Sequence, residues 1–163
     1  MKNKTALKNM EYTRYIGVRY ALALFLFTNL NWSIALFLSK SFLIILPLLL
    51  VLYTAFAALE QIKLYSKKDY PLKHTKNYFT SQAFVNLFLS LTFFSSALYD
   101  KAFPFMASST QGKVGTAGLI GTGLIISVLS IKKINKIEQK KDRLFKEVSK
   151  YKKSMKVSEK NGK

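Results

Sequence analysis

Residues 41–59 read SFLIILPLLLVLYTAFAAL, a run of 19 residues without Asp, Glu, Lys or Arg. A helix on the surface of a soluble domain needs a polar face, which this run cannot provide. At a rise of about 1.5 Å per residue, a helix of this length covers roughly the 30 Å of a bilayer's hydrocarbon core. Three other windows, at residues 20–39, 77–99 and 114–131, are also free of charged residues. The sequence therefore predicts four transmembrane spans.

The composition agrees with this interpretation. The chain has 163 residues, half of them apolar, with 26 Lys or Arg against 8 Asp or Glu and a net charge of +18. A half-apolar chain is not a disordered basic tail. Strands of a membrane barrel alternate between polar and apolar residues, whereas these windows are almost continuously apolar, and in lipid a helix pairs all of its own backbone amides. We expect an all-α integral membrane four-helix bundle.

The basic residues predict how the bundle is oriented. Residues 1–19, 60–76 and 132–163 hold 23 of the 26 Lys and Arg, and the segments between them hold three. Because basic flanks remain on the cytoplasmic side, both termini are expected inside the cell. We divide the chain into a basic N-terminal segment, a four-span domain over 20–131 and a basic cytoplasmic tail over 132–163.

Residue usage indicates the compartment. Cys is absent, and Lys accounts for 23 of the 26 basic residues, which is typical of an AT-rich genome. Without Cys, disulfides, thiolate catalysis and thiolate metal sites are excluded. The first window has no convincing cleavage site and continues through Lys40 into the second window, so we do not expect a cleaved signal peptide. Together with the small size, these features predict a multi-pass protein of a bacterial plasma membrane.

Two windows contain polar residues at mid-depth. Asn29 and Asn31 lie in the first window, and Gln82, Asn86 and Ser90 follow one another at i, i+4 spacing in the third. This spacing places the last three on one stripe of a helix. An amide in hydrocarbon is costly unless it bonds another helix or faces water. We expect hydrogen bonds between the two sets of residues, with a polar transport path as the alternative.

The fourth window is rich in glycine. Gly115, Gly118 and Gly121 lie there, and Ala117 and Gly121 have small-xxx-small spacing. Small residues allow helix backbones to approach closely in lipid. The sequence is compatible with packing inside the same bundle and with a homo-oligomer.

The tail carries apolar residues at alternating spacings of three and four. This pattern is typical of a coiled coil, and it equally fits a helix that continues from the fourth span and lies on anionic lipid. Asp142 and Lys146 have the spacing of a helical ion pair. We expect anionic inner-leaflet lipids as partners of the basic segments, together with a cytoplasmic or in-membrane protein partner. The apolar seam consists of Ile134, Ile137, Leu144, Val148 and Tyr151.

Candidate catalytic groups are sparse. The four windows have no Asp, Glu, Lys, Arg or His, His74 is the sole histidine, and no phosphate-binding glycine loop is present. Glu60 is expected to pair with Lys63 at the membrane surface. We expect no cofactor, metal or nucleic acid and no enzymatic activity. The hypothesis is an accessory or interaction protein. The alternatives are an oligomeric channel or small-solute transport subunit, and an immunity protein against a membrane-active toxin.

The stretch RYALALFLFTNLNW at residues 19–32, with the following hairpin and the basic tail, resembles small four-span membrane proteins of low-GC Gram-positive bacteria. Some of these are labelled as cellobiose phosphotransferase system subunits. The resemblance implies a multi-span membrane protein and adds a sugar-transport subunit to the alternatives. The chain departs from that label, because the phosphorylated subunit of such a system uses an active-site Cys and the sugar-translocating subunit is much larger.

Overall fold

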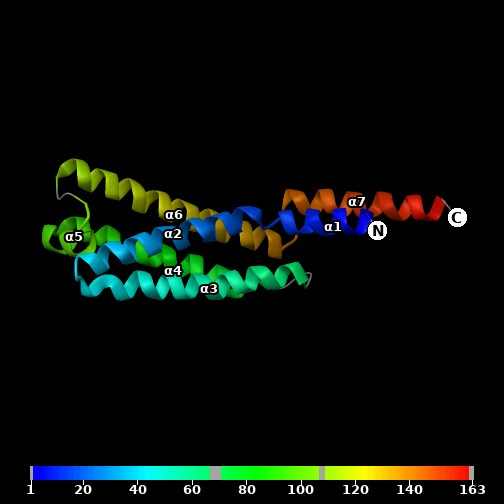
Figure 1. Ribbon diagram of the computed structural model, residues 1–163. Helices are drawn as coiled ribbons and strands as arrows, with labels where there is room; N and C mark the ends of the chain where they lie inside the picture. Colours follow the sequence, from blue (N-terminus) through cyan, green and yellow to red (C-terminus); the bar gives the residue numbers. More distant parts are fainter. Residues whose placement is uncertain (1, 67–70, 107–108, 162–163) are drawn as a thin grey trace.

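The computed structural model describes residues 2–66, 71–106 and 109–161, and every regular element in these ranges is a helix. This confirms the all-α prediction for the described residues. Figure 1 shows the arrangement of the helices. In chain order they are α1 (Lys2–Thr13), α2 (Ile16–Leu38), η1 (Phe42–Ile44), α3 (Ile45–Ser66), α4 (Lys73–Ser90), η2 (Leu91–Phe94), α5 (Ser96–Ala102), α6 (Thr110–Glu138) and α7 (Arg143–Asn161).

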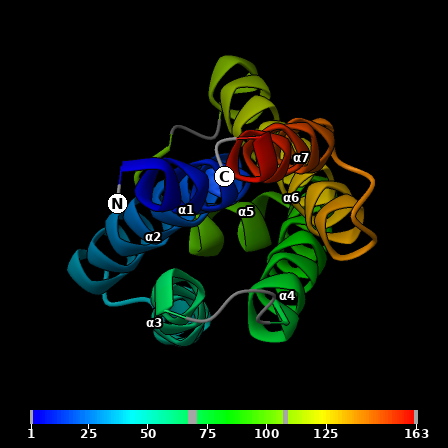
Figure 2. The ribbon, with the colours of Figure 1, turned by 90° about the vertical axis from the view of Figure 1, so that its right-hand side faces the viewer.

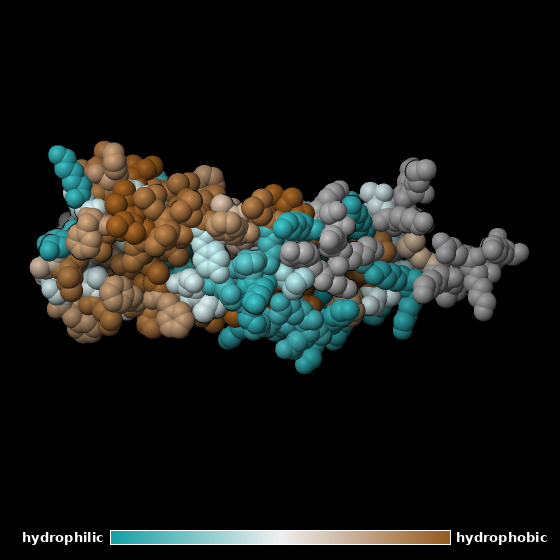
Figure 3. All heavy atoms as spheres, turned by 90° about the horizontal axis from the view of Figure 1, so that it is seen from below, coloured by the Kyte–Doolittle hydropathy of each residue, from teal (hydrophilic) through white to brown (hydrophobic). Residues whose placement is uncertain are grey.

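Four long helices, α2, α3, α4 and α6, lie side by side (Figures 1 and 2). The terminal helices α1 and α7 pack against each other beyond one end of this group, so both chain ends lie at the same end of the molecule. In the space-filling view, apolar side chains cover the part formed by the long helices, and hydrophilic ones gather toward the termini (Figure 3). Charge and apolar surface are thus segregated along the long axis.

Three helical runs are long and apolar enough to cross a membrane. They are Ile16–Leu38, Phe42–Leu64 and Thr110–Met155, the last of which has its uncharged window in α6. Large apolar side chains point away from the rest of the chain along all three runs, for example Phe27, Phe56 and Ile125, each more than 60% exposed. Such outward apolar faces require a non-aqueous environment.

The fourth predicted span, at residues 77–99, is not one continuous helix. α4 ends at Ser90, η2 follows, and Ser95 is extended. The Ser90 hydroxyl donates to the Leu87 carbonyl at 2.6 Å, and the Thr92 hydroxyl donates to Leu89 O at 2.7 Å. These side chains take up carbonyls of the last helical turn, which explains the change to a 3-10 turn and the break. α4 also begins four residues earlier than predicted, at Lys73, and its basic first turn makes it less apolar than the other three.

After the break, α5 closes the end of the bundle away from the termini (Figure 1). The Trp32 indole N–H donates to Ala102 O at 3.0 Å, and the Trp32 ring stacks on Phe103. The hydroxyls of Tyr99 and Thr116 lie 2.8 Å apart, and the Tyr99 side chain is fully buried. These contacts connect α5 to α2 and α6.

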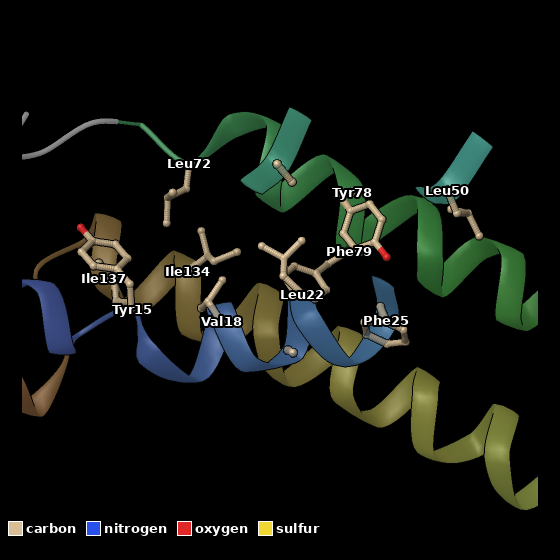
Figure 4. Close-up of a cluster of buried hydrophobic side chains, with 12 residues drawn as sticks. Tyr15, Val18, Leu22, Phe25, Leu50, Leu72, Tyr78, Phe79, Ile134 and Ile137 are labelled. Atoms are coloured by element: carbon tan, nitrogen blue, oxygen red, sulfur yellow. The ribbon is translucent and has the colours of Figure 1, made fainter. Parts of the chain in front are cut away.

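A larger apolar cluster fills the bundle between this end and the termini (Figure 4). Phe25 of α2 makes edge-to-face contacts with Tyr78 and Phe79 of α4, at centroid distances of 6.4 and 6.1 Å. Such ring geometry adds to the free energy of area burial. Buried members of the cluster are Tyr15, Val18, Ala21, Leu22, Phe25, Leu50, Ala57, Leu72, Tyr78, Phe79, Ile134 and Ile137.

Two helices end in the same cap. At the end of α2, Lys40 has a φ of 50°, its N–H donates to Phe37 O, and Ser41 N–H donates to Leu36 O. At the end of α6, Lys140 has a φ of 56°, and the equivalent bonds run to Ile137 and Lys136. This is the Schellman motif, with Lys where glycine is usual. The first cap makes the expected hairpin between α2 and α3.

The second cap contradicts one of the two interpretations of the tail pattern, a helix that continues from the fourth span. α6 ends at Glu138, and α7 begins at Arg143 after a turn. The predicted seam is therefore divided between two helices. Ile134 and Ile137 lie in α6 within the bundle cluster, and Leu144, Val148 and Tyr151 lie in α7.

The cap at Lys40 generates a stability prediction. A side chain in the left-handed region costs about 1 kcal/mol, which glycine avoids. Lys40→Gly is expected to raise the free energy of unfolding by up to about 1 kcal/mol, measured by thermal unfolding in detergent micelles. Lys40→Ala, which removes the charge but keeps Cβ, is the matched control and should not stabilise. Equal stabilisation by both variants would contradict the backbone explanation.

Candidate functional site

A buried hydrogen-bond network connects α2 and α4. The Asn29 amide donates to Gln82 Oε1 at 2.9 Å and to the Tyr78 hydroxyl at 3.4 Å. The Tyr78 hydroxyl in turn donates to Gln82 Oε1 at 3.2 Å. All three residues are at most 3% exposed. The network therefore satisfies polar groups that would otherwise be costly at this depth.

Asn86 extends the network toward α6. The Gln82 amide donates to Asn86 Oδ1 at 3.2 Å. On the other side of Asn86 lies Gly123, where an added Cβ would sit 2.6 Å from Asn86 Nδ2. The absence of a side chain at Gly123 thus gives the Asn86 amide its space between α4 and α6.

Asn31 and Ser90, which we predicted alongside these residues, take no part in the network. The Asn31 amide donates to Phe27 O in its own helix, and the Asn31 side chain is exposed. The Ser90 hydroxyl bonds Leu87 O at the end of α4. The structure therefore brings together Asn29, Gln82 and Asn86 from the predicted polar set.

The three predicted glycines lie elsewhere on α6. A Cβ added at Gly115, Gly118 or Gly121 would meet no atom of the described chain within 4 Å beyond its neighbours and the backbone of its own helical turns. Gly123 has the close neighbour instead. Its position follows from helical phase, because the buried residues of α6 include Thr116, Ile120, Ser127, Ser130 and Ile134. Counting this phase, rather than glycine spacing, would have selected Gly123.

Glu60 performs a role that we did not predict. Its Oε1 accepts from His74 N–H at 3.1 Å, and its Oε2 accepts from Thr75 N–H and the Thr75 hydroxyl, both at 2.7 Å. The carboxylate is 4% exposed and lies at the first turn of α4. It satisfies free amides and complements the positive end of the helix dipole, where we had expected an ion pair with Lys63.

A buried ion pair joins the two terminal segments. Arg14 Nη2 lies 2.6 Å from Asp142 Oδ1, and Arg14 Nε donates to Asp142 Oδ2 at 2.9 Å. Arg14 Nη2 also donates to Ile137 O at 3.3 Å, and Asp142 Oδ2 accepts from Phe145 N–H at 3.0 Å. The pair therefore fixes the α1–α2 turn to the α6–α7 turn. Asp142 therefore pairs with Arg14, whereas the sequence predicted a pair with Lys146.

Further contacts hold α1 against α7 and the start of α2. Lys152 Nζ lies 2.6 Å from Glu11 Oε1, and the Arg19 guanidinium lies 3.2 Å from the centroid of the Tyr12 ring. Val148 is 3% exposed, and Leu144 and Tyr151 are half-buried. We call α1 and α7 the terminal helix pair. Their pairing covers apolar residues of the predicted tail seam.

The polar groups of these sites bond one another and hold the helices together. Within the described residues, no three His, Cys, Asp or Glu side chains gather as a metal site would require. The amides of the central network bond one another, and the buried carboxylates of Glu60 and Asp142 are fully engaged as hydrogen-bond acceptors. Comparisons of the chain with protein-family models, curated proteins and solved structures find no match.

The network predicts that removing a buried amide and removing an exposed amide have different effects on the free energy of unfolding. Gln82→Leu removes the nearer acceptor of the Asn29 amide and leaves it the 3.4 Å bond to the Tyr78 hydroxyl, so it is expected to lower the free energy of unfolding by about 1 kcal/mol. Asn31→Leu removes an exposed amide that bonds only its own helix and should be close to neutral. Thermal unfolding in micelles measures both, and equal losses for the two variants would contradict the network's role.

The glycines predict a second matched comparison. Gly123→Ala forces the Asn86 amide to move and to weaken its bond with Gln82, so we expect a loss of about 1 kcal/mol. Gly118→Ala meets open space in the described chain and should not destabilise the fold of a single copy. Unfolding midpoints of the two variants in micelles check this. A larger loss for Gly118→Ala would show that its face is packed against another chain.

Proposed function

We propose that this protein is a four-span bacterial plasma-membrane protein whose terminal helix pair, on the cytoplasmic side, binds a protein partner. It acts as an accessory or interaction protein rather than as an enzyme. The observation that carries the proposal is the pairing of the two chain ends, held by the buried Arg14–Asp142 ion pair.

The length of α4 with η2 supports a fourth crossing. α4 has 18 residues and η2 has four. With rises of about 1.5 and 2.0 Å per residue, they extend roughly 35 Å, which is enough to cross the hydrocarbon core. Four crossings would leave both termini on one side of the membrane, and the two chain ends lie at the same end of the molecule in Figure 1. That end is the basic one, which favours the cytoplasm.

The terminal helix pair supports the interaction role. It lies outside the apolar helices, and its polar residues face solvent on α7. Removing one member of a buried ion pair is costly, so the arrangement of the two helices is well defined. A defined, water-exposed helical surface attached to a membrane anchor is suited to protein recognition.

The transport alternative depends on the central amides. Asn29, Gln82 and Asn86 use their side-chain groups to bond one another inside one copy of the chain. A conducting path requires such groups to face water or solute. The accessory role therefore has the stronger support.

The proposal is tested by photo-crosslinking in cells. A photoreactive residue replaces Lys150, which is exposed on the terminal helix pair, and in a control chain it replaces Leu129, which is 59% exposed on α6. We expect a discrete protein adduct from position 150 and none of the same mass from position 129. The adduct should decrease severalfold in an Arg14→Gln background, which uncouples the helices. No adduct from position 150, or the same adduct from both, would contradict the proposal.

A further inference from the structure

One face of α7 carries a row of cations. Arg143, Lys146, Lys150 and Lys153 follow at spacings of three, four and three, which places them on one stripe of the helix. All four are exposed, and the Arg143 side chain is 92% exposed. The face with Val148 lies opposite and is covered in the structure. We call these four residues the cationic stripe.

The charge of the terminal helix pair is strongly unbalanced. α1 and α7 together hold ten Lys or Arg and three Glu, a net charge of +7. Within the stripe, Arg143 Nε lies 3.0 Å from Glu147 Oε1, and this exposed pair neutralises one position. The other three members, Lys146, Lys150 and Lys153, form no ion pair with an acidic side chain of the described residues. A polyanionic surface would relieve their mutual repulsion.

The distal half of the cationic stripe lies away from the expected membrane surface. The uncharged window of α6 ends at Ile131, and Lys132, Lys133 and Lys136 follow, where we expect the lipid head groups. α7 begins beyond these and extends along the long axis of the molecule for 19 residues, about 28 Å (Figure 1). The Debye length at physiological salt is about 8 Å. Lys150 and Lys153 lie about 10 and 15 Å along α7 from Arg143, so this half of the stripe is more than one Debye length beyond the start of the helix.

We propose that the cationic stripe binds an acidic face of a cytoplasmic protein, over the roughly 15 Å that separates Arg143 from Lys153. This inference rests on the proposed function and names the chemistry of its partner. The contact is charge-complementary and solvent-exposed, so it contributes mainly to association rate and weakens with salt.

The stripe fits protein better than nucleic acid. Binding of single strands combines basic residues with exposed aromatic rings that stack on bases. In the terminal helix pair, the rings of Tyr12, Phe145 and Tyr151 are half-buried, and Phe145 lies under the Arg14 guanidinium at 5.0 Å. The stripe itself contains no aromatic residue and has Glu147 beside it. An acidic protein surface needs no stacking platform.

The test uses the full chain in nanodiscs of zwitterionic lipid, with a labelled 20-residue polyglutamate peptide as the probe. Lys146→Gln, Lys150→Gln and Lys153→Gln are combined in one variant. The control combines Lys132→Gln, Lys133→Gln and Lys136→Gln, which removes the same charge near the membrane. We expect about a tenfold weaker Kd for the stripe variant and less than about a threefold change for the control. Unfolding midpoints of both variants verify that they are folded.

Three results would overturn the inference. The first is an equal weakening of polyglutamate binding in both variants. The second is tighter binding of a 20-nucleotide oligouridine than of polyglutamate. The third is loss of polyglutamate binding when the nanodisc contains 30% anionic lipid. The last would show that the stripe belongs to the membrane surface. If the stripe binds polyglutamate as expected but position 150 captures no protein in cells, the proposed function fails and the charge chemistry of the stripe stands.

Discussion

The structure depends on one constraint: its long helices present apolar faces that water does not stabilise. Phe37, Phe56 and Phe94 point outward, and Phe94 is 90% exposed. In hydrocarbon the exposure of such faces carries no free-energy penalty, but every polar group at the same depth must find a hydrogen-bond partner within the protein. Hydroxyls such as those of Thr28 and Thr54 meet this demand by bonding the carbonyl four residues earlier in their own helices.

The longer polar side chains meet the same demand between helices. Because lipid offers no hydrophobic drive for helix association, close packing and hydrogen bonds have to supply specificity. Asn29 and Gln82 set α2 against α4, and Gly123 admits Asn86 between α4 and α6. Toward the termini, Glu60 holds the start of α4 and Arg14 holds the two terminal turns together. The apolar faces do not determine how the helices pack against one another, and the polar contacts therefore fix this arrangement.

Much of this architecture could be predicted from the sequence, because hydropathy acts over whole windows. Three of the four uncharged windows coincide with helices able to cross a membrane. The breaks at Ser95 and Gln139 could not be predicted from the sequence. The first depends on side-chain hydroxyls that bond backbone carbonyls. The second depends on a Lys at a helix-cap position where glycine is usual. The Arg14–Asp142 pair joins residues 128 positions apart, and no local pattern indicates such a contact.

The number of crossings is tested most directly by two single cysteines in a chain that has none of its own. Lys73→Cys lies exposed at the start of α4, and Gln111→Cys lies exposed at the start of α6. If α4 with η2 crosses the membrane, an impermeant maleimide added to intact cells labels position 111 and leaves position 73 unlabelled until the cells are lysed. Labelling of both positions, or protection of both, would place them on one side of the membrane, which means three crossings and would contradict the account.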